Sequence, residues 1–255
     1  MRRKVGLALG AGGTRGFAHI GVIKALEENG IKIDYVTGTS MGAVVGGLYV
    51  CGSDLNLVPA FLNQMDEKAF YDYQIPKMGL IAGKKLEELI KLLTKNMDFN
   101  ETKVPFACVA CDFNKARAHV FTEGKIYKAI RSSISVPGVF EPYRYDGKIF
   151  VDGAVVDRVP VQTCRDLGAD VVIGVDVGYK GTPVEDPKNI MEVFMSTIDF
   201  MGWEMTRHKI STADYMIMPE LTHVHQYKLN NVDETVRIGY ETTMRHMPII
   251  KEIIK

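Results

Sequence analysis

Short apolar runs alternate with amphipathic stretches at the beginning of the chain. Residues 5–9 and 31–37 are such runs, each short enough to be a strand that is buried on both faces. Between them, apolar side chains recur at helical spacing until Asn29 and Gly30, a pair that commonly ends a helix. A second helix is predicted to end near Val50. The order strand, helix, strand, helix predicts an α/β protein with a parallel sheet.

The middle of the chain is richer in extended segments than its beginning. Two helices come first, predicted over residues 53–65 and 85–95, with residues 71–83 as the connection between them. Strands are then predicted over residues 105–111, 116–121 and 143–151. The last of these contains Asp146-Gly147, a dipeptide favoured in hairpin turns, so this segment is expected to fold back on itself.

Helices and strands alternate again in the last part of the chain. A helix over residues 160–167 precedes a continuous apolar run over residues 169–177, which is typical of a central parallel strand. A long helix, a short strand and a C-terminal helix follow, predicted over residues 187–210, over residues 215–218 and from about residue 231. Pro248 is expected to kink the last helix. No repeat or linker is recognisable, so the sequence predicts one domain with a mainly parallel central sheet flanked by helices.

The composition is ordinary for a soluble globular protein, with 46% hydrophobic and 24% charged residues. Lys+Arg and Asp+Glu number 31 each, so no excess of positive charge supports a nucleic-acid partner. Four cysteines occur in 255 residues, and two of them, Cys108 and Cys111, point to opposite faces of a predicted strand. That geometry disfavours a metal site or a redox pair. We expect structural thiols and a cytoplasmic location.

Two apolar stretches resemble membrane-directed segments, and their glycines argue against that interpretation. The charged start of the chain and the run after it imitate a secretory signal, but glycines interrupt the run and Arg15 closes it. Residues 35–53 carry no charge and are almost long enough to span a bilayer. Their five glycines favour instead a strand, a tight turn and a closely packed helix.

A serine between the second strand and the second helix is the first candidate for chemistry. The segment GTSMG at residues 38–42 matches G-x-S-x-G in the context in which this pattern marks a nucleophile elbow. Gly38 and Gly42 would let neighbouring chains approach the turn. Ser40 would sit at a helix N-terminus, where the dipole favours a developing negative charge. The alternative is a turn of small residues that only packs a strand against a helix.

A glycine-rich loop, GAGGTRG at residues 10–16, lies between the first strand and the first helix. Its backbone N–H groups have few side chains to block them, and they would bind an oxyanion or a phosphate equally well. As a dinucleotide fingerprint the loop fails, because no glycine in it completes G-x-G-x-x-G. Asp34 also lies at the wrong end of the second strand for a ribose-binding acid.

A reactive serine needs a base, which is either a carboxylate or a histidine. Asp152 follows a predicted strand and precedes Gly153, although Asp-Gly often marks no more than a turn. His223, His225 and His246 fit the order serine, acid, histidine of α/β-hydrolases. His223 and His225 also form a candidate metal pair, for which no third ligand is evident.

Together, four segments resemble the patatin-like phospholipase family, in particular its small bacterial members related to the catalytic domain of neuropathy target esterase. LGAGGTRGFAHIG at residues 9–21 is similar to the family's oxyanion segment, and GTSMG is similar to its nucleophile elbow. SVPGVFEP at residues 135–142 is similar to its proline-containing block, and VDGAVVD at residues 151–157 to its D-G-G/A block. Ala11 and Ala154 stand where many members have glycine.

The resemblance implies a fold and a set of roles. The fold is a three-layer α/β domain over residues 5–218, with residues 219–255 as a helical segment packed on the same domain. Ser40 is the implied nucleophile and Asp152 its base, with no histidine. The implied oxyanion donors are Gly12 and Gly13, and the implied supporting residues are Arg15, Gly38, Gly42 and Gly153. From its position, Arg15 either holds the glycine loop or meets an anionic head group.

The implied chemistry is hydrolysis of carboxylic esters of lipids, of the phospholipase A or lysophospholipase type, through an acyl-enzyme and without cofactor or metal. A soluble short-chain carboxylesterase or thioesterase is the nearest alternative, and a non-catalytic lipid- or nucleotide-binding regulator is another. The methionine-rich helix over residues 189–207 either packs on the core or contacts an acyl chain or a membrane surface. The expected partners are therefore a lipid or acyl-ester substrate and, under the second interpretation, a membrane.

Overall fold

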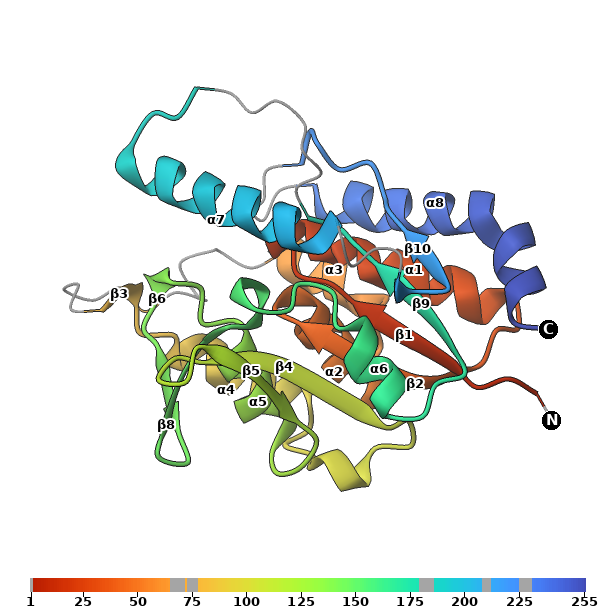
Figure 1. The fold of residues 1–255 in the computed structure, drawn as a ribbon, viewed down its shortest axis with the longest axis horizontal. Coiled ribbons are helices and arrows are strands. Elements are labelled where there is room, and N and C mark those ends of the chain that lie inside the picture. Colours follow the sequence, from red (N-terminus) through yellow and green to blue (C-terminus); the bar gives the residue numbers. More distant parts are fainter. Residues whose placement is uncertain (1, 65–71, 73–77, 179–185, 208–211, 225–230) are drawn as a thin grey trace.

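The computed structural model describes residues 2–64, 72, 78–178, 186–207, 212–224 and 231–255. Within these residues the main sheet (Figure 1) is built from β1 (Val5–Leu9), β2 (Ile33–Thr39), β4 (Phe106–Asp112), β5 (Arg117–Phe121), β7 (Tyr143–Tyr145), β8 (Lys148–Asp152), β9 (Val171–Val175) and β10 (Tyr215–Ile217). Their order is β10–β9–β1–β2–β4–β8–β7, with β5 also paired to β4. The pairs from β10 to β4 are parallel, whereas β5, β8 and β7 are added antiparallel. The predicted α/β class with a mainly parallel sheet is confirmed.

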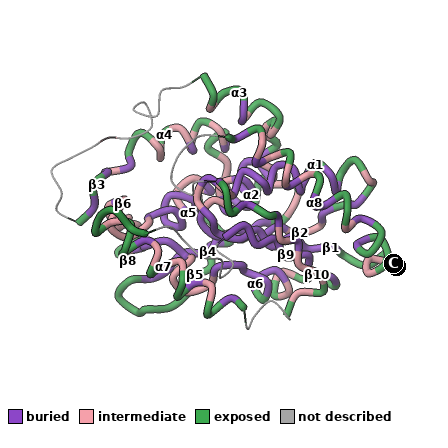
Figure 2. Tube along the Cα trace, turned by 90° about the horizontal axis from the view of Figure 1, so that it is seen from above, coloured by how far each residue is buried: buried purple, intermediate pink, exposed green. Residues whose placement is uncertain are grey.

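Helices cover both faces of the sheet (Figure 2). One face carries α1 (Ala18–Glu28), α2 (Met41–Val50), α5 (Ile126–Ser133) and α8 (Val232–Ile253), and the other carries α6 (Val161–Asp166) and α7 (Ile190–Arg207). The handedness of the crossovers explains this division for α1, α2 and α7, which connect neighbouring parallel strands. The chain moves from β1 to β2 and β4 in one direction and adds β9 and β10 on the other side of β1. Right-handed connections in opposite directions place their helices on opposite faces.

The central strands form the core of the protein. Every residue of β1, β4 and β9 is buried, as expected for strands covered by helices on both faces. Helices α1 and α8 approach closely through a glycine on each: a Cβ at Gly21 would lie 2.0 Å from the Val236 carbonyl oxygen, and one at Gly239 would lie 2.1 Å from that of Ala18. Helix α8 continues through Pro248 to Ile253. The four cysteines are free thiols in buried positions.

Several boundaries differ from the sequence-based expectations. The connection expected over residues 71–83 contains β3 (Gly79–Ile81), which pairs with β6 (Gly138–Phe140), and α5 was not predicted at all. Three-residue strands are too short to show a period, whereas α5 carries buried Ile126, Ala129 and Ile130 at helical spacing, a signal that the sequence analysis missed. Helix α3 (Leu57–Gln64) starts later than expected, because Asp54 accepts hydrogen bonds from Asn56 in a turn before it. The expected helix end at Met65 lies outside the described residues, as do residues 208–210 of the expected long helix.

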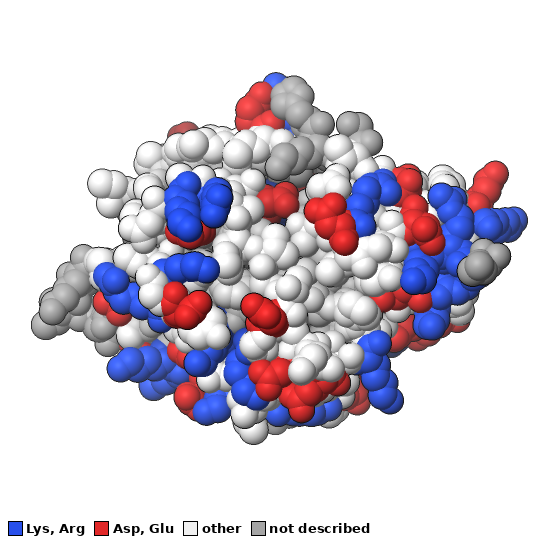
Figure 3. Space-filling model, turned by 60° about the horizontal axis from the view of Figure 1, so that its bottom comes forward, with Lys and Arg blue, Asp and Glu red and all other residues white. Residues whose placement is uncertain are grey.

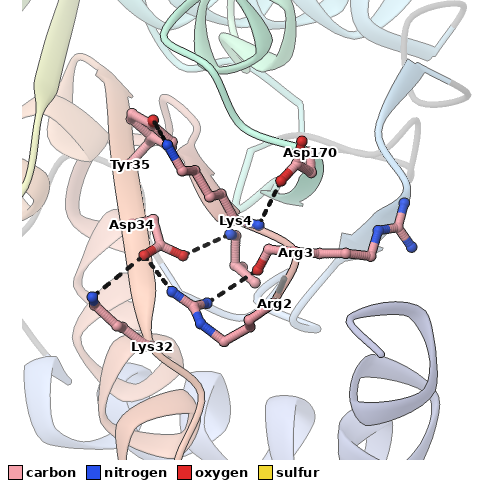
Figure 4. A network of polar contacts seen from close by, with 8 residues as sticks. Arg2, Arg3, Lys4, Lys32, Asp34, Tyr35 and Asp170 are labelled. Carbon is pink, nitrogen blue, oxygen red and sulfur yellow. Dashed lines mark hydrogen bonds and ion pairs between the residues drawn. The ribbon is translucent and has the colours of Figure 1, made fainter.

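A polar cluster fixes the amino ends of the central strands (Figure 4). Asp34, near the start of β2, accepts a hydrogen bond from Arg2 at 2.6 Å and one from the Val5 N–H at 2.9 Å. The Lys4 N–H donates to Asp170, which precedes β9. Asp34 is thus engaged at the end of the sheet opposite to Ser40, as the argument against a ribose-binding role anticipated.

The surface carries charges of both signs. On the face drawn in Figure 3, Lys and Arg side chains lie among Asp and Glu side chains, in keeping with equal totals of 31 for each sign. On this face the mixture of signs creates no single-signed field for a nucleic acid. Among the helices of the described residues, none is long and apolar enough to cross a bilayer.

Candidate active site

The turn between β2 and α2 holds Ser40 in a strained conformation. Its φ of 54° and ψ of −123° lie in a region that side chains avoid, which costs on the order of 1–3 kcal/mol. The flanking glycines are required by close contacts. A Cβ at Gly42 would lie 2.1 Å from the Leu9 carbonyl oxygen, and one at Gly38 would lie 2.4 Å from the Gly42 carbonyl oxygen. The motif therefore has the backbone geometry of a nucleophile elbow.

Ser133, at the end of α5, fixes the elbow from the side. Its hydroxyl accepts a hydrogen bond from the Ser40 N–H at 2.7 Å and donates one to the Val109 carbonyl at 2.6 Å. Both serines are buried. Ser133 thus connects the strained turn to β4, and it holds Ser40 without contacting its hydroxyl. Ser133 was missed because α5 was not predicted, although Ile126, Ala129 and Ile130 recur in it at helical spacing.

Asp152, the last residue of β8, meets Ser40 directly. The Ser40 hydroxyl donates to Oδ2 of Asp152 at 2.6 Å, and the Ala154 N–H donates to Oδ1 at 2.8 Å. The Asp152 N–H in turn donates to the Ser135 carbonyl at 2.9 Å, which ties this aspartate to the proline-containing block. A Cβ at Gly153 would lie 2.3 Å from the Val109 carbonyl oxygen, so only glycine fits after the aspartate.

The environment makes Asp152 a stronger base than an ordinary carboxylate. Burial raises the pKa of Asp152 to about 6, although the hydrogen bonds from Ser40 and Ala154 and the charge of Arg158 act in the opposite direction. The carboxylate of Asp199 raises the pKa further. At pH 7 the group is still mainly ionised, and its pKa is close enough to the working pH for general-base catalysis of proton removal from Ser40.

This pKa predicts how activity depends on pH. Because protonated Asp152 cannot accept the Ser40 proton, kcat/KM for a soluble ester should fall about tenfold per pH unit below pH 6 and level off above it. Chromatographic product analysis between pH 4.5 and pH 8.5 measures the profile. His223→Gln is the control, since it should leave the inflection in place. A flat profile, or an inflection that disappears in His223→Gln, contradicts the assignment.

The glycine-rich loop is held against the site by three hydrogen bonds. The Gly10 N–H donates to the Val175 carbonyl and the Ala11 N–H donates to the Arg158 carbonyl, both at 2.9 Å. Nε2 of His19 lies 2.8 Å from the Gly10 carbonyl oxygen, which can only accept, so this nitrogen carries the proton. Burial lowers the pKa of His19 to about 4, so the ring is neutral. The role of His19 as a clamp was not anticipated.

Gly12 and Gly13 line the same cavity as Ser40 and Asp152. Gly12 is packed so closely that a Cβ would lie 2.7 Å from the Val177 side chain. Gly13 has a φ of 56°, in the left-handed region that glycine adopts freely. Both residues therefore belong to the wall of the cavity that also holds Ser40 and Asp152.

Two arginines support the loop. Arg15 donates from Nε to the Val224 carbonyl at 2.9 Å, which ties the glycine loop to the chain after β10 and favours its role in holding the loop. Arg158 was not singled out from the sequence. Its buried guanidinium fits beside Gly178 and beside Gly202 of α7, and it lies 3.7 Å from Asp199. It therefore connects α7 to the residues around Asp152.

A large apolar cavity opens over these residues. Its volume of about 1740 Å³ exceeds the roughly 300–1,000 Å³ of common ligand pockets. Leucine, isoleucine, valine and phenylalanine side chains of α2, α3, α4 (Lys84–Leu93) and β3 line one part. On the other side lies α7, of which Met191 and Met195 line the cavity. Core packing, the first interpretation of the methionine-rich helix, is wrong for four of its large apolar residues, which are exposed: Phe194, Phe200, Met201 and Met205.

The histidine alternatives receive less support from the geometry. The Ser40 hydroxyl donates to Asp152, whereas His223 lies 3.5 Å from Glu234 and His246 hydrogen-bonds Tyr215. His225 lies outside the described residues. In the part of the chain that the structure describes, no group of three His, Cys, Asp or Glu side chains is arranged to hold a metal ion.

Comparison with known sequences places these motifs in one family. Residues 7–165 match the profile of the family described as patatin-like phospholipase. An uncharacterized NTE family protein of Mycobacterium tuberculosis is 34% identical over 186 residues, which cover 72% of this chain and 52% of that protein. The lysophospholipase nte1 of Emericella nidulans is 28% identical over 286 residues, which cover 98% of this chain and 18% of that protein. The chain thus spans about half the length or less of these relatives.

Two solved structures share the fold. VipD from Legionella pneumophila superposes with a TM-score of 0.56 at 15% identity, over 96% of this chain and 66% of VipD. The type III effector protein ExoU superposes with a TM-score of 0.53 at 13% identity, over 96% of this chain and 53% of ExoU. At such low identity the likeness concerns the architecture alone.

Proposed function

This chain belongs to the patatin-like phospholipase family, as its four motifs predicted, and we propose that it hydrolyses the carboxylic ester of a lipid with one long acyl chain, as a lysophospholipase does. The observation that carries the proposal is the 2.6 Å hydrogen bond from Ser40 to Asp152 beneath a large apolar cavity. Names of relatives that include lysophospholipase nte1 support the choice of substrate.

The proposed reaction is an acyl transfer in two stages. Asp152 accepts the Ser40 proton while Oγ attacks the ester carbonyl carbon, and the N–H groups of Gly12 and Gly13 stabilise the negative charge on the carbonyl oxygen. The carbon–oxygen bond to the alcohol breaks, and Asp152 returns the proton to the departing oxygen. Water then attacks the acyl-serine with Asp152 as base, which releases the fatty acid and restores Ser40.

The cavity supports a long chain over a short one. Each methylene buried in an apolar pocket contributes about 0.8 kcal/mol, and the cavity is walled by apolar side chains from four helices. A short ester would leave most of this wall in contact with water. The polar groups of the cavity floor, Ser40 and Asp152 with the glycine loop, fix only the ester end of the substrate.

The chain-length dependence of hydrolysis tests the proposal. For p-nitrophenyl esters below their aggregation limits, kcat/KM should rise by at least about 100-fold between four and twelve acyl carbons, because the added methylenes are buried in the cavity. Palmitoyl lysophosphatidylcholine should then be cleaved with release of palmitate. Ser40→Ala supplies the blank for each substrate. A rate that is flat or falls with chain length would favour the short-chain esterase instead.

A further inference from the structure

Helix α7 presents large apolar side chains to solvent. Ile190 is 87% exposed and Met201 is 62% exposed, and Val193, Phe194 and Met205 are also exposed. We call these five residues the outer stripe. Successive residues of an α-helix are about 100° apart around its axis. Four residues of the stripe therefore fall within about one sixth of the helix circumference: Ile190, Phe194, Met201 and Met205. Val193 lies beside them. Figure 1 shows α7 in the upper part of the molecule, and the exposure of these side chains places the stripe on the outer surface.

The inner face of the same helix is anchored in the protein. Met195, Gly202 and Thr206 are buried, and a Cβ at Gly202 would lie 2.6 Å from the guanidinium of Arg158. Asp199 of this face forms the ion pair with Arg158. The position of α7 is therefore set by contacts to the residues around the active site, and the outer stripe is the face that these contacts leave exposed.

The outer stripe adjoins the cavity wall through Phe194, because a Cβ at Gly138 would lie 3.4 Å from the Phe194 ring and the neighbouring Pro137 and Val139 line the cavity. Four other exposed apolar residues, Leu57, Phe61, Leu80 and Leu92, also line the cavity, and we call them the apolar rim. The inner face of α7 also lines the cavity, through Met191 and Met195. The other exposed large apolar residues of the described chain are Met78 before β3 and Phe200 of α7, together with Phe113, Val120, Met244 and Ile249, which are scattered over the turn after β4, β5 and α8. Clustered exposed apolar side chains mark an interaction surface, whereas scattered ones do not.

We propose that the outer stripe and the apolar rim form a surface that rests on a zwitterionic phospholipid membrane, with α7 lying in the membrane plane. The idea that a lipid substrate enters the cavity from this membrane rests on the proposed function. Membrane binding itself does not require catalysis. A helix of 18 residues is about 27 Å long and can lie along the surface with its apolar side chains inserted. A second copy on the same surface would cover the cavity mouth and exclude substrate, which argues against a dimer.

The charge balance specifies the kind of membrane binding. With 31 positive and 31 negative residues, the chain gains little from anionic lipid, so insertion of apolar side chains must supply the affinity. Methionine and phenylalanine suit this role, because they adapt to the irregular boundary between head groups and acyl chains. Binding should therefore persist with phosphatidylcholine alone and in high salt.

Sedimentation with phosphatidylcholine vesicles tests the proposal in the Ser40→Ala background, where no lipid is consumed. The triple variant Ile190→Gln, Val193→Gln, Met201→Gln should bind at least about 30-fold more weakly, because three inserted apolar side chains are lost. The matched control, Phe113→Gln, Val120→Gln, Ile249→Gln, removes three exposed apolar side chains elsewhere and should bind like the parent. Equal binding of the two triple variants overturns the proposal, as does binding that requires anionic lipid and disappears in 0.5 M salt.

Activity with Ser40 intact separates this proposal from the proposed function. The outer-stripe variant should hydrolyse a soluble butyrate ester at the parental rate and lysophosphatidylcholine carried in vesicles at least about tenfold more slowly. Loss of both activities, or of neither, contradicts a docking role. Vesicle binding by a chain that cleaves no lipid would refute the proposed function and leave the docking surface standing. The proposal is also overturned if the parent is a dimer that does not bind vesicles and the outer-stripe variant is a monomer. In that case the stripe serves self-association.

Discussion

Replacing Ser40 by alanine is expected to lower kcat/KM for ester hydrolysis by at least about 10⁴-fold, because no other group can form the acyl-enzyme. The residual rate acceleration of Ser40→Ala should come from the oxyanion donors and from substrate binding, as in other serine hydrolases that lose the nucleophile. The hydroxyl donates only to Asp152, so the fold should persist, although the methyl side chain keeps the strained φ of 54°. Initial rates with a long-chain p-nitrophenyl ester measure the loss, and circular dichroism checks the fold.

A neighbouring serine provides the control for this change. Ser132 is buried and donates its hydroxyl to the Lys128 carbonyl within α5, away from the elbow. Ser132→Ala should keep activity within about threefold of the parent, since it removes a local hydrogen bond that contributes about 1 kcal/mol to stability. Substantial turnover in folded Ser40→Ala would show that another nucleophile carries the reaction.

Replacing Asp152 by asparagine should lower kcat/KM by about 10³-fold to 10⁴-fold, because the amide can still accept the Ser40 hydrogen bond but cannot remove the proton. The matched control is Asp146→Asn, which alters the other Asp-Gly pair, in the turn between β7 and β8, and should leave activity unchanged. Rates should be compared above pH 7, where Asp152 of the parent is ionised. Loss of activity in both variants, or in neither, is incompatible with Asp152 as the base.

The same substitution has a predicted effect on stability with a definite sign. A folded pKa of about 6 against an ordinary 3.8 means that the folded state binds the Asp152 proton more tightly than the unfolded state does. The stabilising contribution of this group is therefore complete below pH 4 and is lost as the pH rises through 6, by about 3 kcal/mol at most. Asp152→Asn, which does not titrate, should gain stability relative to the parent across this interval. Denaturant midpoints at pH 4.5 and pH 8 measure the difference.

The sequence predicts the architecture well wherever elements are long and buried. Apolar runs at β1 and β9 are unambiguous because both faces of these strands are covered, and the glycines at positions 38 and 42 fix the elbow between strand and helix. Short strands such as β3 are not predicted, since their few residues show no period and their conformation depends on partners distant in the chain. Helix α5 does carry apolar residues at helical spacing, and it was missed. Gly21 and Gly239 allow α1 and α8 to touch. Their role can be recognised only when the positions of the two helices are known.

The candidate site divides in a similar way. The residues with motifs, Ser40, Asp152 and the glycine loop, could be selected from the sequence and a family resemblance, and the structure places them together. The residues that hold these groups in place could not be selected from the sequence. Ser133 and His19 act through hydrogen bonds to backbone groups, and Arg158 through the space that Gly178 and Gly202 leave. Such contacts depend on tertiary geometry, which no local pattern encodes.

The site of covalent labelling by a fluorophosphonate tests the central claim most directly, because only a serine activated by a base reacts rapidly with it. Intact protein and its peptides should show one adduct, located at Ser40 by mass spectrometry. The labelling rate should fall by at least about 100-fold in Asp152→Asn and remain at the parental value in Asp146→Asn. An adduct on any other residue, or equal labelling of Asp152→Asn and the parent, would contradict a serine nucleophile activated by Asp152.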